Sequence, residues 1–499
     1  MNSENKDDQN SKCENLLPHK GFNSINEAEK KEIELSNNYL ENNNNKNDNC
    51  FNNNNLKFWL FIIILNIFLI IIIIIIFINF YKYEYIEDVN HYAFELLYFT
   101  DNDNETINLF NYSFIKNIFK MNINNEIINP HNRYYFEKKG NHKVYLYIKK
   151  NEMKHMDFMF EDINNLKSVI FYPYINTNII ISMAYMFWEC TFLTSINLTN
   201  FDTQSVTSIS NIFNGCIRLT TINLPKFNTQ NLKDMQSMFY LCKSLTFIDL
   251  TNFDTRSITS MDTLFFLCKS LTSIDLSNFN TQNVISMNST FCHCEKLTYI
   301  DVSKFNTSKV NNMDSMFYFC TSLTSIDVSN FNTQNVKEMS GMFFNCLSLT
   351  SIDVSKFNTS KVINMNIMFS YCKSLTSIDV SKFNTNRVKS LYYIFNHCSN
   401  LTSIDVSNFN TQNIVNMEGM FRDCHKLTSI DAHSFNTQNA KQMDDMFTYC
   451  KSLTYIDISN FIINNHIILF LDLPGGGTIK MNKNYIGKIL YIPSDWKII

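Results

Sequence analysis

The 499-residue sequence is poor in charge, glycine and proline, and these shortages narrow the classes of protein to consider. Charged residues make up 18% of the chain and the formal net charge is −4, so no basic surface is available to attract nucleic-acid phosphates. Only 9 glycines and 6 prolines occur, and the chain has no glycine-rich phosphate loop, Gly-x-Ser-x-Gly elbow or His/Glu metal helix. We therefore predict no enzymatic activity, no cofactor and no nucleic-acid partner.

What the sequence does contain is a repeat of fixed length. Eleven cysteines follow one another at steps of 26 residues. They are Cys190, Cys216, Cys242, Cys268, Cys294, Cys320, Cys346, Cys372, Cys398, Cys424 and Cys450. In every unit a Phe stands three residues before the Cys, a Leu three after, an Ile six after and a second Phe eleven after. Self-similarity at a constant period is the signature of a repeat protein.

Each unit combines two periodicities, as the unit around Cys346 illustrates. Val336, Met339, Met342 and Cys346 have the spacing of one apolar stripe of a short helix. Residues 350–354 then alternate in the manner of a strand with one buried face, with the Thr at position 350 and its equivalents facing inward. We expect one strand, one turn and one short helix in each unit.

A single unit holds too few apolar side chains to offset the conformational entropy lost on folding, so the units are expected to stack. Residues 153–163 reproduce the helical stripe without a cysteine, which brings the count to twelve units over 153–463. The predicted fold is an α/β repeat solenoid with a parallel sheet on one side and short helices on the other.

The strand pattern resembles a known family. The run Leu-x-x-Ile-Asp-Val-x-x-Phe at residues 349–357 resembles a leucine-rich repeat. The longer unit pattern, over about residues 153–461, is similar to the BspA-type leucine-rich repeat surface proteins. This resemblance implies a curved solenoid with a surface-exposed role in binding a protein or matrix ligand. Phe357 and its equivalents stand where leucine-rich repeats usually carry an Asn ladder, so we expect a stacked Phe column to hold this turn.

The chain ahead of the repeats contains one long apolar run. At about 1.5 Å per residue, residues 58–80 are long enough to cross a bilayer as a helix. We predict a single transmembrane signal-anchor helix after a disordered Asn-rich tail, residues 1–57. Lys46 and Lys57 precede the run, whereas Lys82 is followed by acidic residues. This charge bias favours a cytoplasmic tail and an exterior solenoid, a type II orientation.

Two further segments flank the repeats. Residues 81–152 are predicted to form a stalk and an N-terminal cap, with strands at 134–136 and 144–148. Residues 464–499 are predicted to form a C-terminal cap, with short strands at 489–492 and 496–499. A solenoid needs such caps because its end units would otherwise expose their core.

The outward strand positions form the candidate binding face. Its acidic column comprises Asp249, Asp275, Asp301, Asp327, Asp353, Asp379, Asp405, Asp431 and Asp457, headed by Asn197 and Asn223. Stacked carboxylates repel one another, and a divalent cation, a basic partner or neighbouring lysines (Lys243, Lys269, Lys373 and Lys451) would relieve this repulsion. The other interpretation is a solvated face copied along with the repeat. Phe247, Tyr299 and Tyr455 interrupt the Ser row of the same face, and outward aromatic residues are typical of partner contacts.

These observations predict a membrane-anchored surface protein that binds a protein, matrix or glycan partner through its solenoid, in adhesion or recognition. The alternative is a cytosol-facing, membrane-anchored scaffold for intracellular protein partners. Regularly placed unpaired thiols suit a reducing compartment. Burial on the inward stripe would protect them in either compartment, so the exterior orientation is preferred. We predict no metal site at Cys292–Cys294, because three adjacent side chains of a helix cannot all face one ion.

Overall fold

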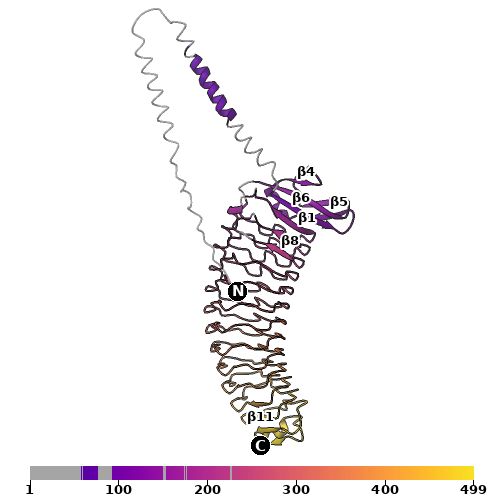
Figure 1. The fold of residues 1–499 in the computed structure, drawn as a ribbon, viewed down its shortest axis with the longest axis vertical. Coiled ribbons are helices and arrows are strands. Elements are labelled where there is room, and N and C mark those ends of the chain that lie inside the picture. Colours follow the sequence, from indigo (N-terminus) through magenta and orange to yellow (C-terminus); the bar gives the residue numbers. More distant parts are fainter. Residues whose placement is uncertain are drawn as a thin grey trace, which may run out of the picture. The chain divides into compact units, whose positions relative to one another are not determined.

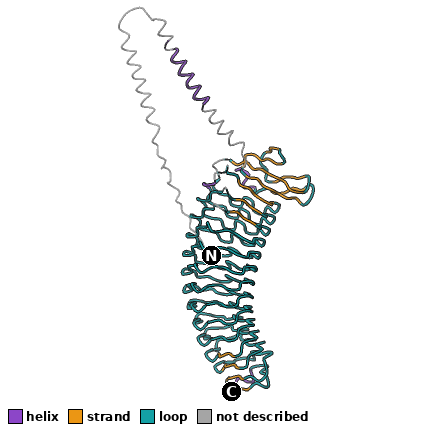
Figure 2. The backbone as a smooth tube through the Cα atoms, viewed as in Figure 1, coloured by secondary structure: helices purple, strands orange, loops and turns teal. Residues whose placement is uncertain are grey.

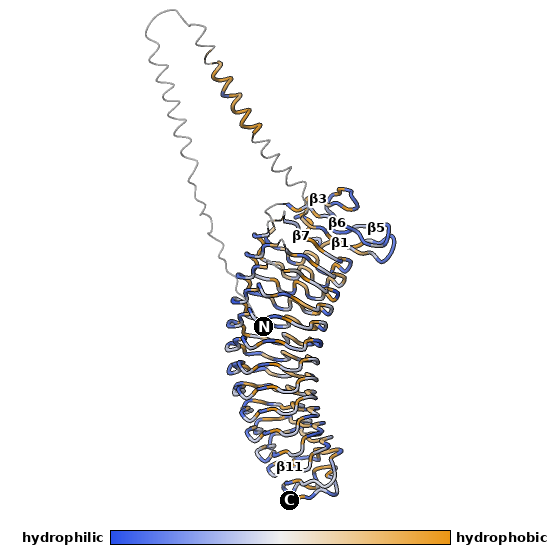
Figure 3. Tube along the Cα trace, viewed as in Figure 1, coloured by the Kyte–Doolittle hydropathy of each residue, from blue (hydrophilic) through white to orange (hydrophobic). Residues whose placement is uncertain are grey.

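The computed structural model describes residue 58, residues 60–76 and residues 93–499 except 150–152, 174, 176, 200, 225 and 226. The chain divides into two units, Met1–Tyr85 and Ile86–Ile499. In the first unit, residues 60–76 form an apolar helix (Figure 3). No helix within the described ranges is long and apolar enough to span a bilayer. Residues 59 and 77–80 of the predicted span, the tail at residues 1–57, and residues 81–92 of the predicted stalk and cap lie outside the described residues.

A β-sheet cap covers the N-terminal end of the repeats (Figure 1). Its elements are β1 (Phe94–Thr100), β2 (Glu105–Asn108), the 3-10 helix η1 (Tyr112–Asn117), β3 (Ile118–Ile123), β4 (Glu126–Ile128), β5 (Arg133–Phe136) and β6 (Gly140–Ile148). β1 pairs antiparallel with β7 (Leu166–Phe171), the first strand of the repeats. The cap thereby extends the repeat sheet and shields its end. The strands predicted at 134–136 and 144–148 are confirmed as parts of β5 and β6.

The repeats form a β-solenoid of about 12 turns, which stack into an elongated and gently curved rod (Figure 1). At the start, β8 (Ser195–Asn197) and β9 (Thr221–Asn223) continue in parallel from β7, and the 3-10 helix η2 (Thr177–Ile179) lies between β7 and β8. At the end, four strands form a parallel sheet. They are β10 (Ser429–Asp431), β11 (Tyr455–Ile458), β12 (Thr478–Met481) and β13 (Lys497–Ile498), with the 3-10 helix η3 (Lys483–Lys488) before β13.

The prediction of one continuous parallel sheet is wrong for the central units. Between β9 and β10 the described chain runs through loops and turns (Figure 2). Where the strands were predicted, the backbone hydrogen bonds between successive units are long. The Thr350 N–H lies 3.3 Å from the Thr324 carbonyl oxygen, and the Thr376 N–H lies 3.4 Å from that of Thr350. In the C-terminal cap, residues 497–498 form a strand as predicted, whereas Ile489 makes only an isolated bridge to Ile467 and 489–492 is not a strand.

The predicted short helix is also wrong, because the helical stripe is a series of tight turns. No residue from 153 onward that the structure describes lies in an α-helix. In the unit around Cys346, alternate N–H groups donate to the carbonyl three residues earlier, at 3.0–3.4 Å. These donors are Met342, Phe344 and Cys346. The N–H groups between them donate instead to the following unit, at 2.8–2.9 Å. Those donors are Gly341, Phe343 and Asn345.

Left-handed residues explain why these turns do not become a helix. The residues five and one before each cysteine have positive φ, for example Gly341 at 59° and Asn345 at 58°. Each is the third residue of its turn, the position at which type II turns require positive φ. A left-handed residue every four positions interrupts a right-handed helix. The apolar side chains still point inward at the same spacing, so the sequence pattern fits a short helix and a series of tight turns equally well.

The core is built from columns that run along the rod. The Phe rings three residues before the cysteines form one stacked column, which begins at Phe160 of the first unit and ends at Phe470 of the C-terminal cap, with neighbouring centroids 5.3–5.9 Å apart. The predicted second column, which contains Phe357, is also buried. Some of its rings stack, such as Phe383 on Phe409 with centroids 6.5 Å apart. Every unit therefore covers the apolar flank of the next.

Candidate binding face

Three exposed columns run along the solenoid and form what we call the Thr-Ser-Asp face. It consists of the residues four, five and seven after each cysteine, which are Thr350, Ser351 and Asp353 in the unit of Cys346. Ile352 lies between them and is buried. The prediction that Thr350 faces inward is wrong. This residue directly follows the turn that ends at Leu349, so the alternation of the strand begins only after it.

Each aspartate of the face closes a local turn. Asp353 Oδ1 accepts hydrogen bonds from the Ser355 N–H at 3.0 Å and the Ser355 hydroxyl at 2.6 Å. Such contacts two residues along the chain define an Asx-turn. The same backbone contact occurs at Asp249, Asp275, Asp301, Asp327, Asp379, Asp405, Asp431 and Asp457. The acidic column therefore has a structural role in each of the nine units that carry it.

These hydrogen bonds outweigh the repulsion predicted between neighbouring carboxylates. The Ser329 hydroxyl and N–H lower the pKa of Asp327, while the charges of Asp301 and Asp353 raise it by less. Lys304, Lys356 and Lys382 lower the pKa of column members in the central units, and Lys480 does so for Asp457. Among the predicted lysines, Lys269 instead pairs with Glu295 at 2.8 Å. The hydrogen bonds of the Asx-turns thus favour the charged form of these carboxylates.

The two ends of the column differ from its middle. Asp457 is only 4% exposed and pairs with Lys480 of β12 at 2.8 Å, so it does not belong to the open face. Asp431 contacts His433 at 2.6 Å. Over the described part of the chain, no three His, Cys, Asp or Glu side chains are grouped to hold a metal ion. The predicted cation site at the Asp column therefore has no ligand cluster among these residues.

Two aromatic side chains project from the face. Phe247 is 57% exposed and Tyr299 is 58% exposed. Both replace the Ser of the middle column, in units separated by one intervening unit. The third predicted aromatic residue, Tyr455, is half-buried in β11. Phe247 and Tyr299 are therefore the large apolar groups that this face offers to a partner.

A buried threonine ladder holds the turn opposite the cysteines, and our reading of the sequence missed it. The Thr333 hydroxyl donates to the Asn358 carbonyl at 3.1 Å and accepts the Asn358 N–H at 2.7 Å. The hydroxyl donor bond recurs from unit to unit at Thr203, Thr229, Thr255, Thr281, Thr307, Thr359, Thr385, Thr411 and Thr437. The sequence feature that could have predicted this ladder is the Thr that follows Phe-Asn or Phe-Asp in these units.

The cysteines form a second buried ladder. The Cys346 thiol donates to the Phe317 carbonyl at 3.2 Å, and the other ten cysteines of the series make the equivalent contact. All cysteines among the described residues are free and buried. Burial raises the pKa of the Cys372 and Cys450 thiols to about 12. Since the thiolate is the reactive form, these cysteines are chemically inert.

The architecture defines a repeat solenoid with an exposed polar face. More specifically, the chain belongs to the family described as "Mycoplasma protein of unknown function, DUF285", whose model matches residues 154–269, 242–351 and 344–461. No curated protein matches this sequence. The BspA-type likeness of the repeat stays a resemblance.

Several solved structures are similar to this chain. One is the TLR13–ssRNA13 complex (14% identity, TM-score 0.18), where the match covers 64% of this chain and 52% of that chain. Another is the functional domain of InlJ from Listeria monocytogenes, which includes a cysteine ladder (14% identity, TM-score 0.18, 66% and 74% covered). A third is the Toll–Spatzle complex from Drosophila (12% identity, TM-score 0.21, 60% and 48% covered). The present chain thus matches about half the length of the first of these proteins. Likeness at such TM-scores carries no functional information.

Proposed function

We propose that this protein binds a protein, matrix or glycan partner through the Thr-Ser-Asp face and performs no catalysis. The observation that carries this proposal is the continuity of the face. Exposed hydroxyl and carboxylate groups recur at the same three positions of successive turns. Backbone, threonine and cysteine ladders fix each turn to its neighbours. A face that is already ordered loses little conformational entropy when a partner binds.

Phe247 and Tyr299 are the proposed anchors of the contact. Aromatic side chains contribute most where they enter a partner's pocket and are surrounded by polar groups that exclude water. Both rings are more than half exposed on a hydrophilic face, and a partner would bury them with a large gain in apolar area. The surrounding Asp residues add charge complementarity for a basic patch on that partner.

We also propose that residues 58–80 anchor the chain in a membrane as a single pass, with the solenoid outside the cell in a type II orientation. The described helix 60–76 supports an anchor, because its side chains other than Asn66 are apolar and most are exposed, for example Phe68 at 61% and Ile70 at 56%. A helix without a polar face is suited to lipid or to a protein core. The lysines before this helix favour a cytoplasmic tail. Adhesion or recognition is the role that follows.

A cytosol-facing scaffold for intracellular protein partners is the second candidate. It is favoured by the free cysteines, because unpaired thiols are typical of reducing compartments. Protease treatment of intact cells separates the two candidates. Loss of the 153–461 region supports the exterior orientation, and its protection supports the scaffold.

The binding role is tested by the double variant Phe247→Ser/Tyr299→Ser. Serine occupies this position in most other units, so the fold should be retained. We expect adhesion to a panel of immobilised matrix proteins and glycoproteins to weaken at least tenfold. Tyr240→Asn is the matched control, because Tyr240 lies on the turns before a cysteine and Asn214 is its equivalent in the preceding unit. Adhesion that survives the double variant would overturn the proposal, and the control variant should adhere as the wild type does.

A further inference from the structure

A groove of about 500 Å³ lies among the turns that precede the cysteines of four successive units. It is separate from the Thr-Ser-Asp face, which follows the cysteines. Its volume falls in the range of roughly 300–1,000 Å³ that small-molecule sites occupy. Aromatic side chains predominate in its walls, and they belong to Phe344, Tyr371, Tyr392, Tyr393 and His397.

The aromatic walls are held in place by packing. Tyr392 and Tyr393 are perpendicular to one another, at 88°, with ring centroids 4.3 Å apart. Tyr371 packs on His397 with centroids also 4.3 Å apart. The Tyr393 ring lies over Gly419 of the next unit, where a Cβ atom would clash with it. Only a glycine at position 419 therefore leaves space for the Tyr393 ring at this distance.

The groove coincides with a departure from the repeat. Tyr392 and Tyr393 stand six and five residues before Cys398, where the neighbouring units have Asn366–Ile367 and Glu418–Gly419. In no other unit of the sequence are both positions aromatic. The tyrosine pair is thus not needed to build a turn of the solenoid, since the same turn forms with small or polar residues at these positions.

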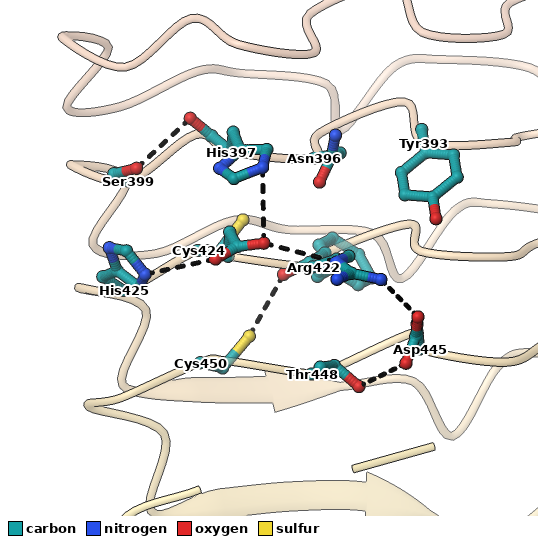
Figure 4. Close-up of polar contacts among 12 residues, drawn as sticks. Tyr393, Asn396, His397, Ser399, Arg422, Cys424, His425, Asp445, Thr448 and Cys450 are labelled. Carbon is teal, nitrogen blue, oxygen red and sulfur yellow. Dashed lines mark hydrogen bonds and ion pairs between the residues drawn. The ribbon is translucent and has the colours of Figure 1, made fainter. Parts of the chain in front are cut away.

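The polar part of the groove contains an acceptor without a partner. Asn396 is 6% exposed and lies between His397 and Tyr393 (Figure 4). Its Nδ2 donates to the Ser370 hydroxyl at 3.2 Å, whereas its Oδ1 has no hydrogen-bond partner. A buried acceptor in this state is destabilising until a donor reaches it. A hydroxyl group inserted between the neighbouring rings would supply that donor.

The charges at the groove are already neutralised. Arg422 is the one charged residue of its lining, and it pairs with Asp445 and Asp423 (Figure 4). His397 Nε2 lies 3.4 Å from Asp423 Oδ2, but burial lowers the pKa of this imidazole and favours its neutral form. No unpaired charge in the lining calls for a charged ligand. A neutral ligand with hydroxyl donors and apolar C–H faces fits these groups.

We infer that this groove binds a neutral carbohydrate, a mono- or disaccharide unit, which packs its C–H groups against Tyr392 and Tyr393 and donates a hydroxyl to Asn396 Oδ1. The negative π face of an aromatic ring attracts the weakly positive C–H groups of a sugar ring. The site does not depend on the function proposed for the Thr-Ser-Asp face.

Saturation-transfer NMR on the full chain tests this inference, with cellobiose, maltose, lactose and N,N′-diacetylchitobiose as probes, in a detergent without a sugar head group. At least one probe should bind, with the strongest transfer at its ring C–H protons. Tyr392→Ser/Tyr393→Gly should weaken that binding at least tenfold, and Asn396→Ser should weaken it less. These variants keep the fold because Ser340, Gly341 and Ser370 occupy the same positions in neighbouring units.

Phe247→Ser/Tyr299→Ser is the matched control and should bind the sugar as the wild type does, even if it loses adhesion. The inference is overturned if none of the four disaccharides binds or if the tyrosine double variant binds the sugar unchanged. Loss of sugar binding in the Phe247/Tyr299 variant would also overturn it. Decaproline, which fits aromatic grooves as an extended helix, is the competing occupant. Tyrosine-dependent binding of that peptide without sugar binding would replace the carbohydrate with a protein segment.

Discussion

At the residue scale, threonine has two different roles in this solenoid. Thr350 is exposed, and its hydroxyl donates to the Thr324 carbonyl at 3.4 Å. Thr333 is 1% exposed, and its hydroxyl bonds both backbone groups of Asn358. Water can replace the first hydroxyl but not the second. Only the second should therefore contribute strongly to stability.

Replacing Thr333 with Val tests this difference, because Val has nearly the same shape without the hydroxyl. The change removes both hydrogen bonds of a buried hydroxyl, which should lower the free energy of unfolding by about 1–3 kcal/mol. Thr350→Val is the control and should change it by less than about 0.5 kcal/mol. Urea unfolding measures both values. Equal losses in the two variants would contradict the ladder.

The Asx-turn aspartates give stability a defined pH dependence. Hydrogen bonds from the neighbouring Ser side chains and N–H groups lower the pKa of Asp301, Asp327 and Asp353 in the folded chain. A group whose folded pKa is lowered stabilises the fold above its unfolded pKa, about 3.9, and loses this contribution as the pH falls through the folded value. Stability should therefore fall on acidification below roughly pH 4.

Changing these three aspartates to Asn should reduce that acid sensitivity while keeping the fold at pH 7. Asn197 shows that the amide can replace the carboxylate, because its Oδ1 accepts the Thr199 N–H at 3.0 Å in the first cysteine-containing unit. Thermal unfolding between pH 7 and pH 3 would show the smaller loss. An unchanged slope would mean that other groups determine the acid response.

At the element scale, the sequence predicted which side chains are buried but not the backbone that buries them. The spacing of Met339, Met342 and Cys346 is the same in a helix and in consecutive type II turns. The turns differ from a helix in the left-handed backbone five residues and one residue before each cysteine. In the unit of Cys346 these residues are Gly341 and Asn345. Other units place Ile, Thr or Tyr at these positions. These residue types rarely adopt positive φ, so the sequence carried little sign of the turns.

Ile367 is the clearest case, since a β-branched residue adopts φ 51° there. The left-handed conformation costs a non-glycine residue on the order of 1–2 kcal/mol. Ile367→Asn should raise the free energy of unfolding by on the order of 1 kcal/mol, because Asn tolerates this conformation and Asn211 is the equivalent residue of an earlier unit. Gly341→Val should have the opposite effect. Chemical unfolding of both variants would detect the difference, and a less stable Ile367→Asn would contradict the strain.

At the scale of the whole molecule, the repeat and its caps were predictable, whereas the groove was not. A fixed step of 26 residues directly predicts stacking, and the Asp column with Phe247 and Tyr299 follows from the strand alternation. The groove joins equivalent turn positions of four units, but the residue types at these positions differ from unit to unit. The unpaired acceptor of Asn396 depends on side-chain contacts that only coordinates reveal. Departures from the repeat, such as the Tyr392–Tyr393 pair, were the available signal.

The central claim is that the units form one stack in which each is stabilised by its neighbours. Deleting residues 336–361 removes one complete unit and joins Asn335 to Val362, which restores the Asn-Val step that precedes Met339. Deleting residues 336–348 instead removes half a unit and breaks every ladder at that point. Calorimetry of both variants tests the claim most directly.

The whole-unit deletion should fold and unfold in one cooperative transition with a slightly lower midpoint, since one set of neighbour contacts is lost. The half-unit deletion should lose this transition or split it into two. Equal behaviour of the two deletions, or separate transitions in the intact chain, would show that the units do not stabilise one another.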